Sequence, residues 1–169
     1  MAHDLEDYTH IEEELVDLLN VLLAGLPPNA ATLEVMRALP QGDGVVAKLE
    51  PKNPAAASIV VHAENGFALV DFSFGDYGPT WELPYEGSKP KPSKQELLRE
   101  VEQMCRAVIA GRCQHNRGLL NVSGTIQVGD RPSTVTHFFV LRPTPPFKGT
   151  RKYESYIYSD QRVQYPHVR

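Results

Sequence analysis

Two side chains that could act together in acid–base chemistry, His62 and Asp71, lie on either side of the dipeptide Asn65-Gly66. Asn-Gly is a preferred pair for a two-residue hairpin turn, because both residues tolerate positive φ. In such a hairpin His62 and Asp71 are one diagonal step apart, about 7–8 Å between Cα atoms, so the carboxylate could orient an imidazole base. Ser58 falls on the same face and is the candidate nucleophile.

These residues make a hydrolase-like enzyme one alternative function. A serine nucleophile also needs an oxyanion hole, and the sequence contains no G-x-S-x-G motif. A solvated cross-strand pair explains His62 and Asp71 as well, so we favour a protein that is not an enzyme. The pair Cys113 and His115 lacks two further nearby ligands and is expected to lie in a polar loop. We therefore expect no metal and no cofactor.

The carboxyl-terminal region combines aromatic and basic residues and is the candidate binding region. Its members, with two aromatic residues of an earlier segment, are Trp81, Tyr85, Arg151, Lys152, Tyr153, Tyr156 and Tyr158. Tyrosine, tryptophan and arginine are enriched as anchors of protein interfaces. The same mixture occurs in single-stranded nucleic-acid binding, where rings stack on bases and cations follow phosphates. A final edge strand with half-buried tyrosines is the third interpretation.

Charge is distributed unevenly along the chain. The 169 residues include 17 basic and 21 acidic side chains, a net charge of −4, yet residues 1–50 carry −8 and residues 112–169 carry +6. This polarity suits an acidic partner for the basic end, or attraction between the two ends, and the negative total disfavours nucleic acid. No signal segment and no apolar run of about 20 residues occurs, so we expect a cytoplasmic protein without membrane contact.

Two amphipathic helices are predicted from apolar residues spaced three and four apart. Capping boxes start them, Thr9 with Glu12 in the first helix and Ser93 with Glu96 in the second. A shorter helix is expected over residues 30–39.

Alternating apolar and polar residues predict the strands. A two-residue turn at Asn65-Gly66 pairs Val61 with Val70 and places apolar side chains on one face of the hairpin. By the same alternation, further strands are predicted over residues 45–50, 80–85, 118–128, 133–142 and 151–158.

Because the strands arrive as hairpins, we predict an α+β fold with an antiparallel sheet of about five to six strands and both helices packed on one face. Residues 1–169 form a single domain, with residues 143–169 as a tail or edge strand. This order of elements is similar, at the level of fold alone, to that of several small bacterial α+β immunity and antitoxin proteins. We therefore predict a non-catalytic protein-binding module of the immunity or inhibitor type, whose partner is another protein.

Overall fold

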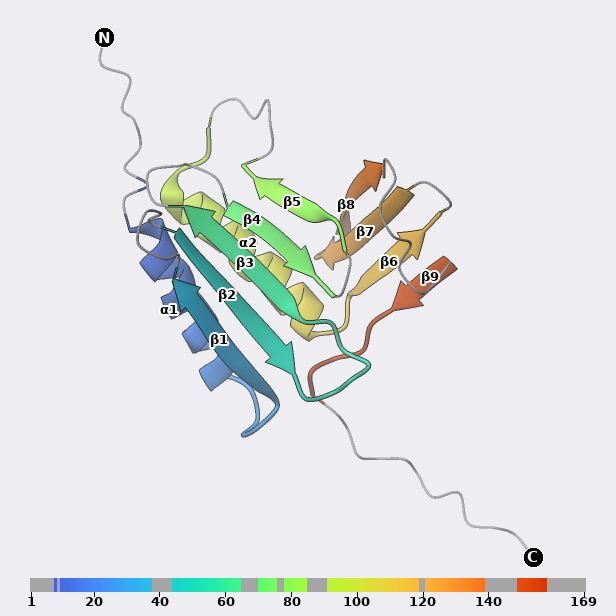
Figure 1. The fold of residues 1–169 in the computed structure, drawn as a ribbon, viewed down its shortest axis with the longest axis horizontal. Coiled ribbons are helices and arrows are strands. Elements are labelled where there is room, and N and C mark those ends of the chain that lie inside the picture. Colours follow the sequence, from blue (N-terminus) through green and yellow to red (C-terminus); the bar gives the residue numbers. More distant parts are fainter. Residues whose placement is uncertain are drawn as a thin grey trace, which may run out of the picture.

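The strands form two antiparallel sheets, and the long second helix crosses behind the larger one (Figure 1). The computed structural model describes residues 8, 10–37, 44–64, 70–75, 78–84, 91–118, 121–138 and 149–157. In chain order the elements are α1 (Ile11–Ala24), β1 (Ala31–Arg37), β2 (Gly44–Pro51), β3 (Ile59–Glu64), β4 (Val70–Phe74), β5 (Thr80–Leu83), α2 (Lys94–Ile109), β6 (Cys113–Arg117), β7 (Asn121–Val128), β8 (Arg131–Phe138) and β9 (Gly149–Lys152). The sheet orders are β1-β2-β3-β4-β5 and β8-β7-β6-β9.

The predicted α+β class with antiparallel pairing is confirmed. The strands divide between sheets of five and four, whereas the sequence predicted a single sheet. Alternate residues of β2, β3 and β4 are buried in one core with the apolar stripes of both helices. The opposite face of the five-stranded sheet carries the half-exposed and exposed residues of the same strands. The helices therefore cover one face of this sheet and leave the other open.

The predicted register of the β3–β4 hairpin is wrong by two residues. Val61 pairs with Phe72 instead of Val70, and Ala63 pairs with Val70. The two-residue turn predicted at Asn65-Gly66, which lies outside the described residues, does not fit this register. Because the shift is an even number of residues, residues 59–63 and 70–74 keep their predicted faces of the sheet.

Two other segments differ from the prediction. The sequence predicts a helix over residues 30–39, but Ala31–Arg37 form the edge strand β1, paired along its whole length with β2. Continuous pairing with a neighbour outweighs a weak local helical preference. The loop predicted at Cys113 and His115 is also wrong, since β6 runs through these residues between β7 and β9.

The helix starts confirm one of the two predicted caps. The Ser93 hydroxyl accepts from the Glu96 N–H at 3.2 Å, and the Glu96 carboxylate accepts from the Ser93 N–H at 2.8 Å. The bond from the Ser93 N–H and, after it, a bond of 3.0 Å from the Ser93 hydroxyl to the Glu96 carboxylate lower the pKa of the Glu96 carboxyl. Thr9, the other predicted cap, lies outside the described residues; α1 begins at Ile11, and its N-cap is His10, which makes no side-chain capping bond.

Trp81 joins the two sheets. Its side chain is fully buried, and its Nε1 donates to the Ser133 hydroxyl at 3.1 Å. The ring lies against Gly124 of β7, where an added Cβ would stand 2.6 Å from Trp81 Cη2. Only a residue without a side chain allows the indole this close to the second sheet.

An aromatic cluster extends the same junction along β6. The His115 ring stacks on Phe74 at 4.4 Å between centroids, and its Nδ1 shares a hydrogen bond of 3.0 Å with the Tyr153 hydroxyl. All three side chains are buried. A histidine that appeared to belong to a polar loop is therefore part of the packing between the sheets.

Three buried ionisable groups make the stability of the fold depend on pH in the alkaline range. Burial raises the pKa of the Cys113 thiol to about 12 and also raises those of the Cys105 thiol and the Tyr156 hydroxyl. In the unfolded chain a thiol loses its proton near pH 8.5 and a phenol near pH 10, by about their ordinary pKa values. Above these values the unfolded state binds fewer protons than the folded state, so stability falls as pH rises.

We expect the free energy of unfolding to fall between about pH 8.5 and pH 10.5, by up to about 1.4 kcal/mol per pH unit for each group that titrates only in the unfolded chain. Urea denaturation across this range measures the slope. Replacing Cys105 and Cys113 together by alanine should flatten its lower part, where thiols titrate. An unchanged slope in that variant would contradict the assignment.

Candidate functional site

His62 and Asp71 face each other directly across β3 and β4, on the open face of the sheet. His62 Nδ1 lies 3.4 Å from Asp71 Oδ2, and the side chains are 36 % and 43 % exposed. Direct pairing replaces the predicted diagonal because of the register shift. This contact is an ion pair only when the histidine is protonated, and an ion pair this accessible contributes about 0–1 kcal/mol to stability.

Ser58 is not brought to this pair. It precedes β3, is only 8 % exposed, and its carbonyl accepts from the Gly75 N–H at 2.8 Å. Four residues of extended chain separate Ser58 from His62, which at about 3.3 Å per residue is roughly 13 Å. The three candidates therefore form no assembled triad, and the hydrolase-like function remains a prediction.

Three of the aromatic residues predicted to bind a partner belong to the core, which corrects their assignment as surface anchors. Trp81, Tyr153 and Tyr156 are 0 %, 6 % and 1 % exposed. Their composition suggested an interface, but the chain turns each ring inward between the sheets and helices. Arg151 and Lys152 are exposed on β9. Two further predicted aromatics lie outside the described residues: Tyr85 and Tyr158.

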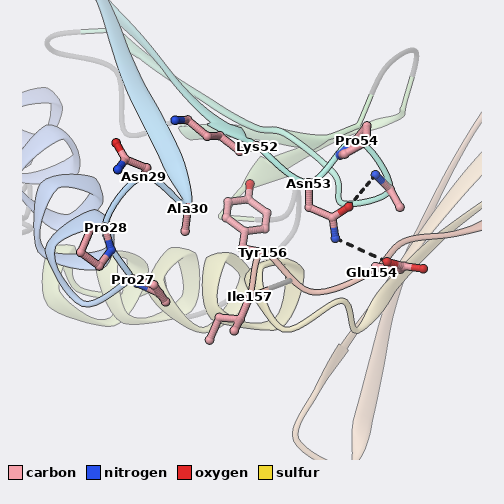
Figure 2. Close-up of a pocket in the computed structure, with 11 residues that line it drawn as sticks. Pro27, Pro28, Asn29, Ala30, Lys52, Asn53, Pro54, Glu154, Tyr156 and Ile157 are labelled. Atoms are coloured by element: carbon pink, nitrogen blue, oxygen red, sulfur yellow. Dashed lines mark hydrogen bonds between the residues drawn. The ribbon is translucent and has the colours of Figure 1, made fainter. Parts of the chain in front are cut away.

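A cleft of about 620 Å³ opens at one end of the five-stranded sheet (Figure 2). Three segments meet there, one after α1, one after β2 and one after β9. Its lining residues are Pro27, Pro28, Asn29, Ala30, Lys52, Asn53, Pro54, Ala55, Glu154, Tyr156 and Ile157. Most of them are exposed, so the cleft is an open surface feature that a partner can reach.

Residues 153–157, here called the strap, are held to the β2–β3 connection by Asn53. The Asn53 Nδ2 donates to the Ser155 carbonyl at 2.9 Å, and its Oδ1 accepts from the Ala55 N–H at 3.0 Å. The same Nδ2 also donates to the Glu154 carboxylate at 3.4 Å (Figure 2). The Glu154 N–H donates to the Ala55 carbonyl at 2.9 Å. Asn53 is 6 % exposed, so its amide serves the fold and not a ligand.

Tyr156 is the strap residue that packs into the core, and its side chain forms the buried floor of the cleft. Its hydroxyl donates to the Ala57 carbonyl at 2.7 Å, and its N–H donates to the Ile109 carbonyl at 2.9 Å. The strap also passes over Gly111, where an added Cβ would stand 2.6 Å from the Glu154 carbonyl carbon. The cleft is thus preformed on a rigid base.

The lining combines apolar side chains with two charged ones. Pro27, Pro28 and Ile157 present exposed apolar surface, while Lys52 and Glu154 add one charge of each sign. The described lining contains no histidine, cysteine or serine. A partner would therefore meet an apolar wall bordered by two opposite charges.

Sequence analysis missed this cleft. In the sequence, Pro27 and Pro28 are typical only of a helix end. The hydrogen bond from Asn53 to Ser155 joins residues 102 positions apart. No local sequence pattern predicts a contact between segments so far apart in the chain.

Comparison of the chain with protein-family models, curated proteins and solved structures found no match. Within the described ranges no group of three or more His, Cys, Asp and Glu side chains is arranged to hold a metal ion. Neither α1 nor α2, the helices of the described part, has the length and apolar character needed to cross a membrane.

Proposed function

We propose that this protein is a non-catalytic module that binds another protein, and that the cleft over the strap receives a segment of that partner. The exposed apolar wall above a rigid floor carries the proposal. Ile157 is 56 % exposed beside the fully packed Tyr156. Covering apolar surface contributes about 25 cal/mol per Å², and a preformed floor spares the cost of ordering.

The two charges at the cleft define the partner further. Lys52 and Glu154 are both exposed. Charges at the rim of an interface contribute to selectivity and association rate more than to affinity. The segment that fits best has an apolar side chain between an acidic and a basic residue.

An inhibitor or immunity-type role is the finer proposal, because such proteins act by occupying a partner and need no chemistry of their own. Both cysteines are free thiols, as is usual in a reducing compartment. This supports a cytoplasmic location for the interaction.

Selection of a displayed random peptide library on the full chain tests the proposal. Selected peptides should carry an apolar residue flanked by charges, and Ile157→Asp should weaken their binding at least tenfold. The matched control is Val21→Asp, because Val21 is an exposed aliphatic residue of α1, 66 % exposed, away from the cleft. Val21→Asp should leave binding unchanged.

Two results would count against the proposal. One is a selection that yields no saturable binder. The other is a binder that tolerates Ile157→Asp, or that loses as much affinity with Val21→Asp.

A further inference from the structure

A second cleft, of about 320 Å³, lies where α2 leads into the four-stranded sheet. Its lining residues are Gly111, Arg112, Cys113, Gln114, Thr125, Gln127, Lys152 and Tyr153. None of them lines the cleft over the strap. It is therefore a separate surface feature.

Strand pairing brings its polar side chains together. Gln114 of β6 pairs with Lys152 of β9 on one side and with Thr125 of β7 on the other, so the three side chains leave the same face of the sheet. Arg112 directly precedes β6, and its carbonyl accepts from the Gln127 N–H at 2.9 Å. Five side chains that carry hydrogen-bond donors therefore line this cleft. Four come from strands β6, β7 and β9, and the fifth, Arg112, comes from the segment between α2 and β6.

The charge of this cleft differs from that of three other clefts formed by the described residues. Those three clefts each include at least one carboxylate among their lining residues. These are Glu154 in the cleft over the strap, Glu96 and Glu100 in a cleft between α2 and the β7–β8 hairpin, and Glu50 in a cleft beside Gly75. This cleft includes none, but has Arg112 and Lys152. Both cations are exposed, and neither forms an ion pair within the described residues.

The remaining lining does not oppose an anion. The Cys113 thiol has its pKa raised by burial to about 12 and stays uncharged at neutral pH. Gln114 adds an amide donor beside the two cations. The Thr125 hydroxyl shares a hydrogen bond with the Thr134 hydroxyl, and the Gln127 Nε2 donates to the Gly129 carbonyl. Guanidinium groups suit phosphate because their donors match two of its oxygens.

We propose that this cleft binds a small phosphate monoester, with Arg112 and Lys152 as the charge partners of the phosphate. Two cations match the charge of a dianion. The volume is close to the lower end of ligand sites, which is about 300 Å³, and suits a small molecule. This proposal does not depend on the protein-binding function, since the two clefts share no residue.

Calorimetric titration of the full chain with phenyl phosphate at low salt tests the proposal. Saturable binding is expected, weakened at least tenfold when Arg112→Gln and Lys152→Gln are combined. Both side chains are exposed, so the variant should fold normally, which circular dichroism checks. The control is Arg106→Gln, which removes an exposed cation of α2 that pairs with Glu102, and it should bind as the parent chain does.

Inorganic phosphate and a single-stranded oligothymidylate form the other arms of the titration. Weaker binding of inorganic phosphate at the same site supports a monoester ligand. The proposal is overturned if phenyl phosphate does not bind, if the control loses as much affinity as the double variant, or if the oligonucleotide binds at least tenfold more tightly than phenyl phosphate.

Discussion

Replacing Tyr156 by alanine is expected to lower the free energy of unfolding by about 3–5 kcal/mol, as for other large buried aromatic residues. The ring is 1 % exposed, and its hydroxyl bonds the Ala57 carbonyl at 2.7 Å and the Leu49 carbonyl at 3.3 Å. Its removal leaves a cavity and frees the strap from the sheet. Tyr156→Phe keeps the ring but leaves Ala57 without its donor, which should cost about 1–2 kcal/mol.

Urea denaturation of the unsubstituted protein, Tyr156→Ala and Tyr156→Phe measures these differences in the free energy of unfolding. The neighbouring Ile157 provides the matched control, because it belongs to the same strap but is 56 % exposed. Ile157→Ala should change stability by no more than about 0.5 kcal/mol. If Tyr156→Ala and Ile157→Ala have the same effect, the strap is not anchored as described.

Replacing Trp81 by alanine is expected to lower the free energy of unfolding by a similar amount, about 3–5 kcal/mol. The indole has no exposed surface, contacts Phe72 and Phe74, and donates to Ser133 of the other sheet. The loss therefore weakens the junction as well as the core. Near-ultraviolet circular dichroism with urea denaturation follows both changes.

Gly124 provides an independent check of the same junction. A Cβ there meets Trp81 Cη2 at 2.6 Å and Pro79 Cγ at 3.0 Å, so Gly124→Ala should cost about 1–3 kcal/mol by overpacking. In a Trp81→Leu background the ring atom is gone, and the added methyl should cost less. Additive effects of the two substitutions would show that the residues do not touch.

The sequence predicts best those elements whose signal is local. The alternation of Val45, Ala47 and Leu49 places them in the core as expected, and the Ser93 capping box starts α2. The β3–β4 register could not be predicted, because a shift of two residues keeps Val61 and Phe72 on the apolar face. The apolar–polar alternation shows which side chains share a face of the sheet, but only the turn determines which residues pair across the two strands.

Elements stabilised by distant partners escape sequence analysis. β1 has one buried residue, Ala31, and depends on its pairing with β2. In β6 the side chains of His115 and Arg117 are buried although both are polar. An alternation of apolar and polar residues therefore does not reveal this strand in the sequence. The strap residue Tyr156 likewise shows its role only through contacts to Ala57 and Ile109.

The most direct test of the protein-binding cleft is amide chemical-shift mapping of the labelled full chain with a selected peptide. The account predicts that the largest shifts occur in residues 29–30, 52–55 and 154–157, the segments that line the cleft. Largest shifts at His62 and Asp71 on the open face of the sheet, or at Arg112 and Lys152, would contradict it.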